Sequence, residues 1–246
     1  MAARVLDLFT VVWGDMAQSF TEGTLRSLLQ PGNIPAAAPL LGTYTIYSDD
    51  TTRRRVSWHP LYRQLRQAIE VEWEPLVKGR GEVTSNIVRQ MQKSLERGHY
   101  MLVMSPDWIL GDGSLKNMAQ LCAEGKHNPI LYGFPRLTEA GWKLAMEGLR
   151  EGVITNRDLV TLAMYHIEQV TYPVVYHVSG YKEGAPWIVC QNAWDVAHNV
   201  PTPCLKPDTD ILEIFRSNST INSGYDHTMP YILKEKGYPW HLIRHS

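Results

Sequence analysis

An acidic loop follows an apolar segment near the middle of the chain. Residues 100–104 are apolar or aromatic, which predicts a short buried strand, and the loop behind them carries Asp107 and Asp112. Gly98 is expected to end the preceding helix, and Ser114 to cap the following one. A carboxylate at the carboxyl end of a buried strand, directly before a helix, lies where open α/β sheets bind their ligands. The sequence therefore predicts an active site around Asp107.

A second acidic pair has a similar setting. Asp49 and Asp50 directly follow residues 44–47, whose aromatic and β-branched side chains are typical of a strand. Acids in such a position also occur in plain solvated turns, so the pattern leaves both a binding and a turn role open.

A third polar group lies much later in the chain. Residues 192–201 place polar side chains, among them Asp195 and His198, between apolar ones. Trp187 and Trp194 lie close in sequence and could stack on a sugar or a base, although tryptophans also pack in cores. Asp195 could equally be a surface or helix-capping acid, and His198 a core histidine.

Alternating strands and helices must position these groups. Five strands are predicted, at residues 5–13, 44–47, 71–77, 100–104 and 129–132. Helices are predicted between them, over about 15–29 with Asp15 as cap, over about 61–69, from Thr84 or Ser85, and from 114 to Gly125. Residues 35–39 are interpreted as a loop. This alternation predicts a mainly parallel, right-handed sheet with helices on both faces.

The second half of the chain has a different pattern. Helices are predicted to begin at Thr138 and Asn156, and the residues beyond 172 are irregular and aromatic, with strand-like segments at 174–178 and 187–190. Prolines at 201, 203 and 207 argue against a regular helix there. We interpret residues 1–246 as one domain, with a nucleotide-binding half (1–137) and a loop-rich acceptor half (138–246).

Composition narrows the class of protein. With 246 residues, of which 44% are hydrophobic, the chain is long enough to bury a full core. The formal charge of −1 gives no overall attraction for nucleic acid, and Arg53, Arg54 and Arg55 are interpreted as a solvated loop.

The cysteines and the apolar runs bear on where in the cell the protein is expected. The three cysteines are far apart in the sequence and lack a C-x-x-C spacing, which predicts neither a disulfide framework nor a zinc site and favours the cytoplasm. No apolar run approaches the length of a membrane span, and an acid at Asp7 argues against a signal peptide.

Several segments together resemble the GT-A family of nucleotide-sugar-dependent glycosyltransferases. The resemblance covers roughly residues 5–137 in order, and more loosely the loop up to His198. Residues 98–107 carry it most strongly, because they resemble the family's helix end and the strand that leads to its D-x-D motif. The other matching segments are 9–14, 27–33, 44–50 and 86–98.

This resemblance implies a divalent metal, Mn²⁺ or Mg²⁺. In the family the D-x-D carboxylates hold the ion against the nucleotide diphosphate, where it neutralises charge on the leaving group. Here the motif is Ser105-Pro106-Asp107, so Asp107 is the remaining acid. His198 would be a further ligand, with Asp112 as a weaker alternative. Without a metal, basic side chains or the helix start at Ser114 would have to balance the charge.

The resemblance also assigns the other site residues. Val12, Trp13 and Gly14 at the end of the first strand, together with Asp49, would frame the base and ribose of the nucleotide-sugar. Asn86 and Ser105 would face the same cleft. In inverting members a carboxylate base takes the proton of the acceptor hydroxyl, and Asp195 is the candidate.

The resulting hypothesis is transfer of a sugar from a nucleotide-sugar, such as a UDP-sugar, to an acceptor hydroxyl. The acceptor could be a glycan, a small molecule or a hydroxylated DNA base, and the basic residues Arg53–Arg55, Lys234, Lys236 and Arg244 are what would favour DNA. Two alternatives remain: a non-catalytic nucleotide-sugar-binding module, and a nucleotidyltransferase. The second lacks the Gly-rich basic signature expected directly after the first strand, where Trp13 to Met16 stand.

Overall fold

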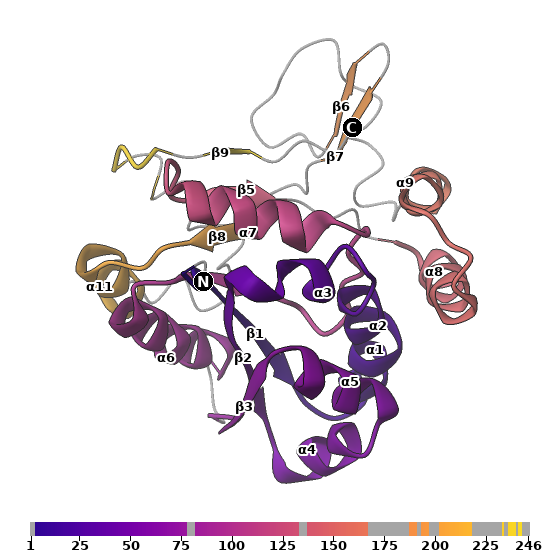
Figure 1. Ribbon diagram of the computed structural model, residues 1–246, viewed down its shortest axis with the longest axis horizontal. Helices are drawn as coiled ribbons and strands as arrows, with labels where there is room; N and C mark the ends of the chain where they lie inside the picture. The colour runs from indigo at the N-terminus through magenta and orange to yellow at the C-terminus, as the bar shows by residue number, and fades with distance from the viewer. Residues whose placement is uncertain are drawn as a thin grey trace.

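The computed structural model describes residues 3–77, 82–132, 137–166, 187–190, 193–196, 202–217, 233, 236–239 and 241–242. Within these ranges a central sheet has the strand order β3-β2-β1-β4-β8-β5-β9 (Figure 1). Its strands are β1 (Leu6–Val12), β2 (Leu41–Ser48), β3 (Glu70–Pro75), β4 (Tyr100–Val103), β5 (Ile130–Tyr132), β8 (Thr202–Leu205) and β9 (His241–Leu242). β6 (Trp187–Cys190) and β7 (Ala193–Val196) pair with each other in a separate two-stranded sheet.

Helices connect these strands. The first connection is one helical run made of α1 (Met16–Ser19), the π-helical η1 (Phe20–Thr24) and α2 (Leu25–Leu28). The others are α3 (Ile34–Ala37), the 3₁₀ turn η2 (Ala38–Leu40), α4 (Asp50–Ser57), α5 (Pro60–Ala68), α6 (Glu82–Arg97), α7 (Ser114–Glu124), α8 (Glu139–Glu151), α9 (Asn156–Tyr165) and α11 (Thr209–Ser217).

The pairing confirms the predicted α/β class with a mainly parallel, Rossmann-like sheet. β1 is parallel to both of its neighbours, β2 and β4, and β3 is parallel to β2. β8 was not predicted; it inserts between β4 and β5 and is antiparallel to both. Because the chain proceeds from β1 to β3 on one side and continues at β4 on the other, the strand order reverses between β1 and β4.

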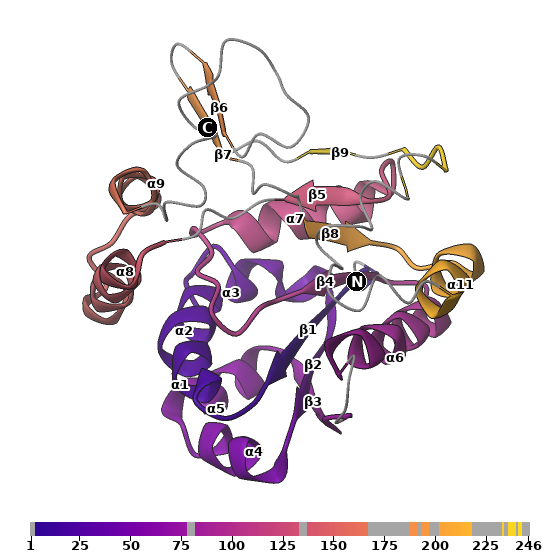
Figure 2. The same cartoon turned by 180° about the vertical axis from the view of Figure 1, so that it is seen from behind.

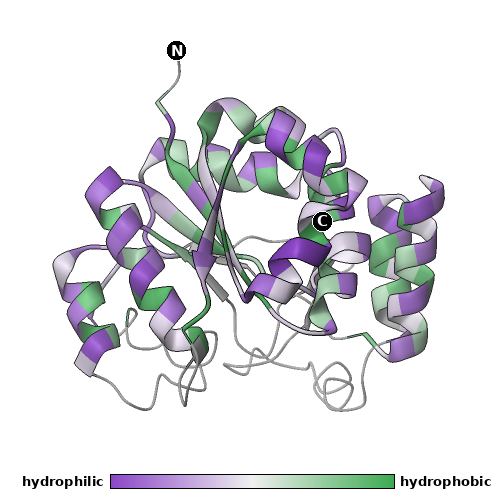
Figure 3. Cartoon of the chain, turned by 90° about the horizontal axis from the view of Figure 1, so that it is seen from below, coloured by the Kyte–Doolittle hydropathy of each residue, from purple (hydrophilic) through white to green (hydrophobic). Residues whose placement is uncertain are grey.

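Helices lie on both sides of the sheet (Figure 3), and β1 shows why. All seven of its residues are buried, and their side chains alternate between two cores. Leu8 and Val12 join a core with residues of α2, α5 and α7, whereas Phe9 and Val11 join one with residues of α6 and α11. A strand covered on both faces reads as a continuous apolar run, which is why the sequence predicted it.

Several local predictions were wrong. Asp15 holds the cap position of α1 but makes no side-chain capping bond, and α6 begins at Glu82 rather than at Thr84 or Ser85. Ser114 does not cap α7: Gly113, with φ +88°, holds the cap position, and Asn33 Oδ1 accepts a hydrogen bond from Leu115 N at 2.9 Å in place of a local cap. Residues 35–39 are not a loop, because proline is compatible with the first turn of a helix and α3 contains Pro35 there. Arg53–Arg55 lie on α4 rather than in a loop.

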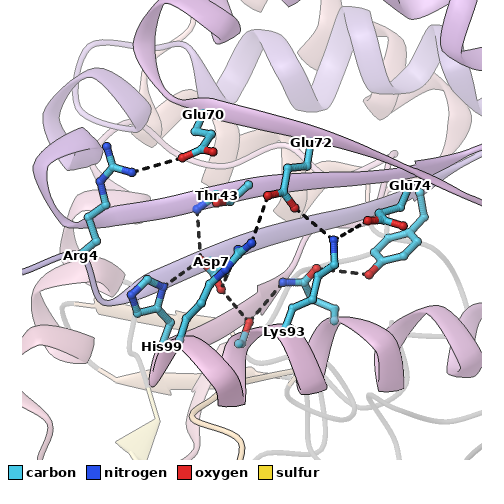
Figure 4. Close-up of polar contacts among 12 residues, drawn as sticks. Arg4, Asp7, Thr43, Glu70, Glu72, Glu74, Lys93 and His99 are labelled. Atoms are coloured by element: carbon cyan, nitrogen blue, oxygen red, sulfur yellow. Dashed lines mark hydrogen bonds and ion pairs between the residues drawn. The ribbon is translucent and has the colours of Figure 1, made fainter.

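A dense polar network connects the amino edge of the sheet to α6 (Figure 4). Asp7 of β1 is fully buried and accepts hydrogen bonds from Thr43 N (3.1 Å), Ser94 Oγ (2.9 Å) and His99 Nδ1 (3.0 Å), while Arg97 Nη1 lies 3.6 Å away. Ion pairs continue along β3, from Arg97 to Glu72 (3.0 Å), from Lys93 to Glu72 (3.1 Å) and Glu74, and from Arg89 to Glu74 (2.6 Å).

Two cysteines that are distant in sequence are neighbours in space. Cys122 of α7 and Cys204 of β8 are free, buried thiols whose sulfur atoms lie 3.6 Å apart. Cys122 packs in the core cluster that also contains residues of α2 and α5. Among the described residues, no helix is both long enough and apolar enough to cross a membrane. On one face of the sheet α6 and α11 lie side by side (Figure 2).

Candidate functional site

The reversal of strand order brings most of the predicted site residues to one edge. The carboxyl ends of β2, β1 and β4 are neighbours in the sheet, and Met104 N donates to Phe9 O at 2.8 Å to extend the pairing of the last two. Asp49 follows β2, Trp13 and Gly14 follow β1, and the loop with Ser105 and Asp107 follows β4. Ligands of open α/β sheets bind in the crevice outside such a switch point.

Asp49 links the ends of β1 and β2. Its Oδ1 accepts hydrogen bonds from Thr51 N (3.0 Å) and Thr52 N (2.9 Å), so it caps α4. Its Oδ2 accepts from the Thr52 hydroxyl at 2.8 Å, and that hydroxyl accepts from Gly14 N at 3.1 Å. These bonds, first of all the one from Thr52 N, hold the pKa of Asp49 below its ordinary value. A fixed carboxylate therefore stands beside the turn at Gly14.

The residues after β1 differ in exposure. Val12 is completely buried in the core, so its side chain is closed to a ligand and it can contribute backbone atoms. Trp13 is 41% exposed, which is high for a large aromatic side chain at the end of a buried strand. Gly14 has φ +54°, a conformation that favours glycine. Trp13 thus keeps part of its indole accessible at the carboxyl end of β1.

Buried hydroxyl groups fix the loop after β4, although their residues were not among the predicted site residues. The Thr10 hydroxyl donates to Met104 O at 2.7 Å. The Thr24 hydroxyl donates to Ser105 O (3.3 Å) and accepts from Trp108 N (3.1 Å). Polar residues inside an apolar strand or helix face, such as Thr10 and Thr24, were the signal that could have indicated these anchors.

Asp107 itself is exposed and accepts a hydrogen bond from the Ser105 hydroxyl. Asp112 has a different environment. Its Oδ1 accepts from Gly32 N at 2.6 Å, and its backbone exchanges hydrogen bonds with the Asn156 side chain at 2.6 and 2.8 Å. Asp107 is therefore open to a ligand, whereas Asp112 ties its loop to two other segments.

A protein-bound metal ion usually needs several ligand side chains close together. No three His, Cys, Asp or Glu side chains among the described residues gather as a ligand set. Asp107 supplies one exposed carboxylate, and His198 lies outside the described residues. Magnesium commonly binds through one or two carboxylates while substrate phosphates and water complete its shell. Asp107 fits that mode, and the metal stays a prediction.

Asn86 and Asp195 are placed less directly. The Asn86 side chain is fully buried on α6, and its Oδ1 accepts from Val77 N at 3.3 Å, which favours a structural role after β3. Asp195 lies in β7, opposite Ile188 of β6. Its side chain and the whole of His198 are outside what the structure describes, so the general base also stays a prediction.

No protein-family model matches the sequence, and no curated protein matches it. Solved structures do show partial similarity. S. aureus TarS 1–349 is 14% identical with a TM-score of 0.39, covering 53% of this chain and 35% of that one. A longer S. aureus TarS chain is 15% identical with a TM-score of 0.38, and the match covers 53% of this chain and 21% of that one. The chain thus spans well under half the length of either TarS chain.

A third similar structure is the 4-diphosphocytidyl-2C-methyl-D-erythritol synthase from Anaerococcus prevotii. It is 6% identical with a TM-score of 0.48, and the match covers 99% of this chain and 90% of that chain. Similarity at these levels assigns no function, so a functional proposal has to rest on the switch-point residues themselves.

Proposed function

We propose that the chain binds a nucleotide-sugar outside the β1–β4 switch point and transfers its sugar to an acceptor hydroxyl. The observation that carries this proposal is the grouping of an exposed aromatic ring, Trp13, with two carboxylates, Asp49 and Asp107, at three adjacent strand ends. A nucleotide-sugar offers a base that can stack, ribose hydroxyls that can donate hydrogen bonds, and a diphosphate.

Each of the three side chains has a distinct task in this proposal. Trp13 stacks on the base. Asp49, ionised and held by Thr52, accepts a hydrogen bond from a ribose hydroxyl on the lone pairs that its cap leaves open. Asp107 would hold a Mn²⁺ or Mg²⁺ ion, with His198 as its predicted second ligand. Such an ion supplies positive charge beside the leaving diphosphate.

The transfer step needs a base on the acceptor side. As the acceptor oxygen bonds to the anomeric carbon, the bond from that carbon to the diphosphate oxygen breaks, and the acceptor proton passes to a carboxylate. Asp195 is proposed for this role in an inverting reaction. An Asp195→Asn variant is then expected to keep donor binding and to slow transfer.

Trp13 provides a direct test of donor binding. Loss of a stacked base by substitution costs about 1–3 kcal/mol, so Trp13→Leu should weaken binding of the preferred UDP-sugar roughly fivefold or more in calorimetry. Trp58→Leu is the matched control, since Trp58 is 79% exposed but lies at the far end of α4. Equal weakening in both variants would contradict the placement of the base.

A panel of nucleotide-sugars, with and without Mn²⁺, tests the reaction. Asp107→Asn should abolish sugar transfer, while Glu151→Gln, an exposed acid at the end of α8, should retain it. Full activity of Asp107→Asn would refute the site. Binding without turnover by the unmodified protein would favour the binding module, and release of pyrophosphate from nucleoside triphosphates would favour the nucleotidyltransferase.

A further inference from the structure

A separate cavity lies between η1, the end of α4 and α8. Its volume is about 360 Å³, and the polar side chains that line it include Gln18, Glu22, Arg55, His59 and Arg150. None of the predicted nucleotide-sugar residues lines it. The volume falls in the range of pockets that hold small metabolites.

Glu22 is the acidic residue that lines this cavity, and basic side chains of the protein already compensate its negative charge. Its carboxylate pairs with Arg26 at 3.2 Å, and its other oxygen lies 3.1 Å from His59 Nε2. Burial alone would raise the pKa of Glu22, but the hydrogen bonds from His59 and Arg26 outweigh burial and lower it. The negative charge of Glu22 is therefore satisfied from the protein side.

The two arginines that face this cavity are less engaged. Arg150 Nε lies 3.6 Å from Glu22, beyond good hydrogen-bond distance, and its side chain is 60% exposed. Arg55 is exposed and has no ion pair or hydrogen bond to another described residue. Arg26 and His59 lie closer to Glu22 than Arg150 does, so Arg150 forms just a long ion pair with Glu22, and both guanidinium groups keep donors for an anion.

We propose that this cavity binds a small phosphate monoester, with its phosphoryl group held between Arg55 of α4 and Arg150 of α8. Two guanidinium groups on separate helices suit a group with three acceptor oxygens better than a single carboxylate, since each arginine can engage a different edge. The π-helical η1 supports the assignment, because such segments often occur at functional sites. Gln18 and His59 would contact the body of the ligand.

Inorganic phosphate is the probe for the test. In calorimetry at fixed ionic strength, the unmodified protein should bind phosphate saturably, and Arg55→Gln and Arg150→Gln should each weaken binding by about tenfold. Arg63→Gln is the matched control, because Arg63 is an exposed arginine on the neighbouring α5 that does not line the cavity. Trp13→Leu should also leave phosphate binding unchanged.

A variant that is expected to bind phosphate more tightly gives a second test. Glu22→Gln removes the negative charge from the cavity while keeping the size of the side chain, so it should tighten phosphate binding several-fold. Absence of saturable binding by the unmodified protein would overturn the proposal. Equal binding by Arg55→Gln, Arg150→Gln and Arg63→Gln would overturn it as well, because the anion would then lie elsewhere.

Discussion

Aspartates at the amino and carboxyl ends of the parallel strands, here called the amino edge and the carboxyl edge of the sheet, have opposite roles. At the amino edge, Asp7 is completely buried and surrounded by donors from β2, α6 and the residue before β4. At the carboxyl edge, Asp107 is exposed and accepts one hydrogen bond, from its neighbour Ser105, among the described residues. A buried carboxylate must be satisfied by the protein, whereas an exposed one at a switch point is free to bind a ligand.

Asp49 stands between these two cases. Its carboxylate caps α4, like a structural acid, yet it lies at the carboxyl edge beside Gly14. Substitution should therefore lower stability most at Asp7, less at Asp49 and least at Asp107. It should weaken ligand binding in the reverse order.

The largest effect is expected for Asp7→Ala. Removal of the carboxylate leaves Thr43 N, Ser94 Oγ and the His99 ring without their acceptor, so the variant should lose about 3 kcal/mol of unfolding free energy or more. For a chain of this length that corresponds to a drop of roughly 10 °C in melting temperature, measurable by calorimetry.

Asp15→Ala is the control for that variant. Asp15 occupies the cap position of α1 but makes no side-chain capping bond, so its removal should change stability by less than about 0.5 kcal/mol. Similar melting temperatures for Asp7→Ala and the unmodified protein would show that the amino-edge network does not stabilise the fold.

A smaller effect is expected for Asp49→Ala. Loss of the cap should cost about 1 kcal/mol in denaturant unfolding, and Asp49→Asn should recover most of it, because asparagine caps nearly as well. Both variants lose the negative charge, so both should weaken donor binding. If Asp49→Ala were as stable as the unmodified protein, the Asp49 cap would not contribute to the stability of α4.

The difference between buried and exposed residues also explains which elements could be predicted from the sequence. β1 and β2 were predicted because all their residues are buried and leave a continuous apolar or β-branched run. α4 was missed because just Thr52 and Val56 of its eight residues are buried, so it has no apolar stripe. β8 was missed because it contains Pro203 and joins the sheet from a distant part of the chain.

The site was predicted in outline rather than in detail. Acids after apolar strands indicated Asp49 and Asp107, since strand ends meet at one edge of a parallel sheet. The sequence could not show that Thr52 connects Asp49 to Gly14, or that Asn33 reaches α7, because those contacts join residues that only the fold brings together. The proximity of Cys122 and Cys204 was hidden for the same reason.

The ion pairs along β3 should show a weak dependence on pH. Burial would raise the pKa of Glu74, but the hydrogen bond and charge of Lys93, with Arg89, lower it. Above the unfolded pKa of about 4.3, Glu74 is ionised in both states and its stabilisation is complete; below it, the unfolded chain takes up the proton first and the stabilisation is lost. Glu74→Gln should therefore cost about 0.5 kcal/mol at pH 7 and less at pH 3.5 in urea unfolding.

The smallest effect on stability is expected for Asp107→Asn. Its side chain is exposed, and its one hydrogen bond among the described residues comes from the Ser105 hydroxyl, which can also donate to an amide oxygen. The unfolding free energy should therefore change by less than about 0.5 kcal/mol. Donor binding with Mn²⁺ should nevertheless weaken strongly, because a neutral amide oxygen holds a hard divalent cation less tightly than a carboxylate does. A large loss of stability would instead assign Asp107 a structural role like that of Asp7. The aspartates at the two ends of the strands would then not differ in role.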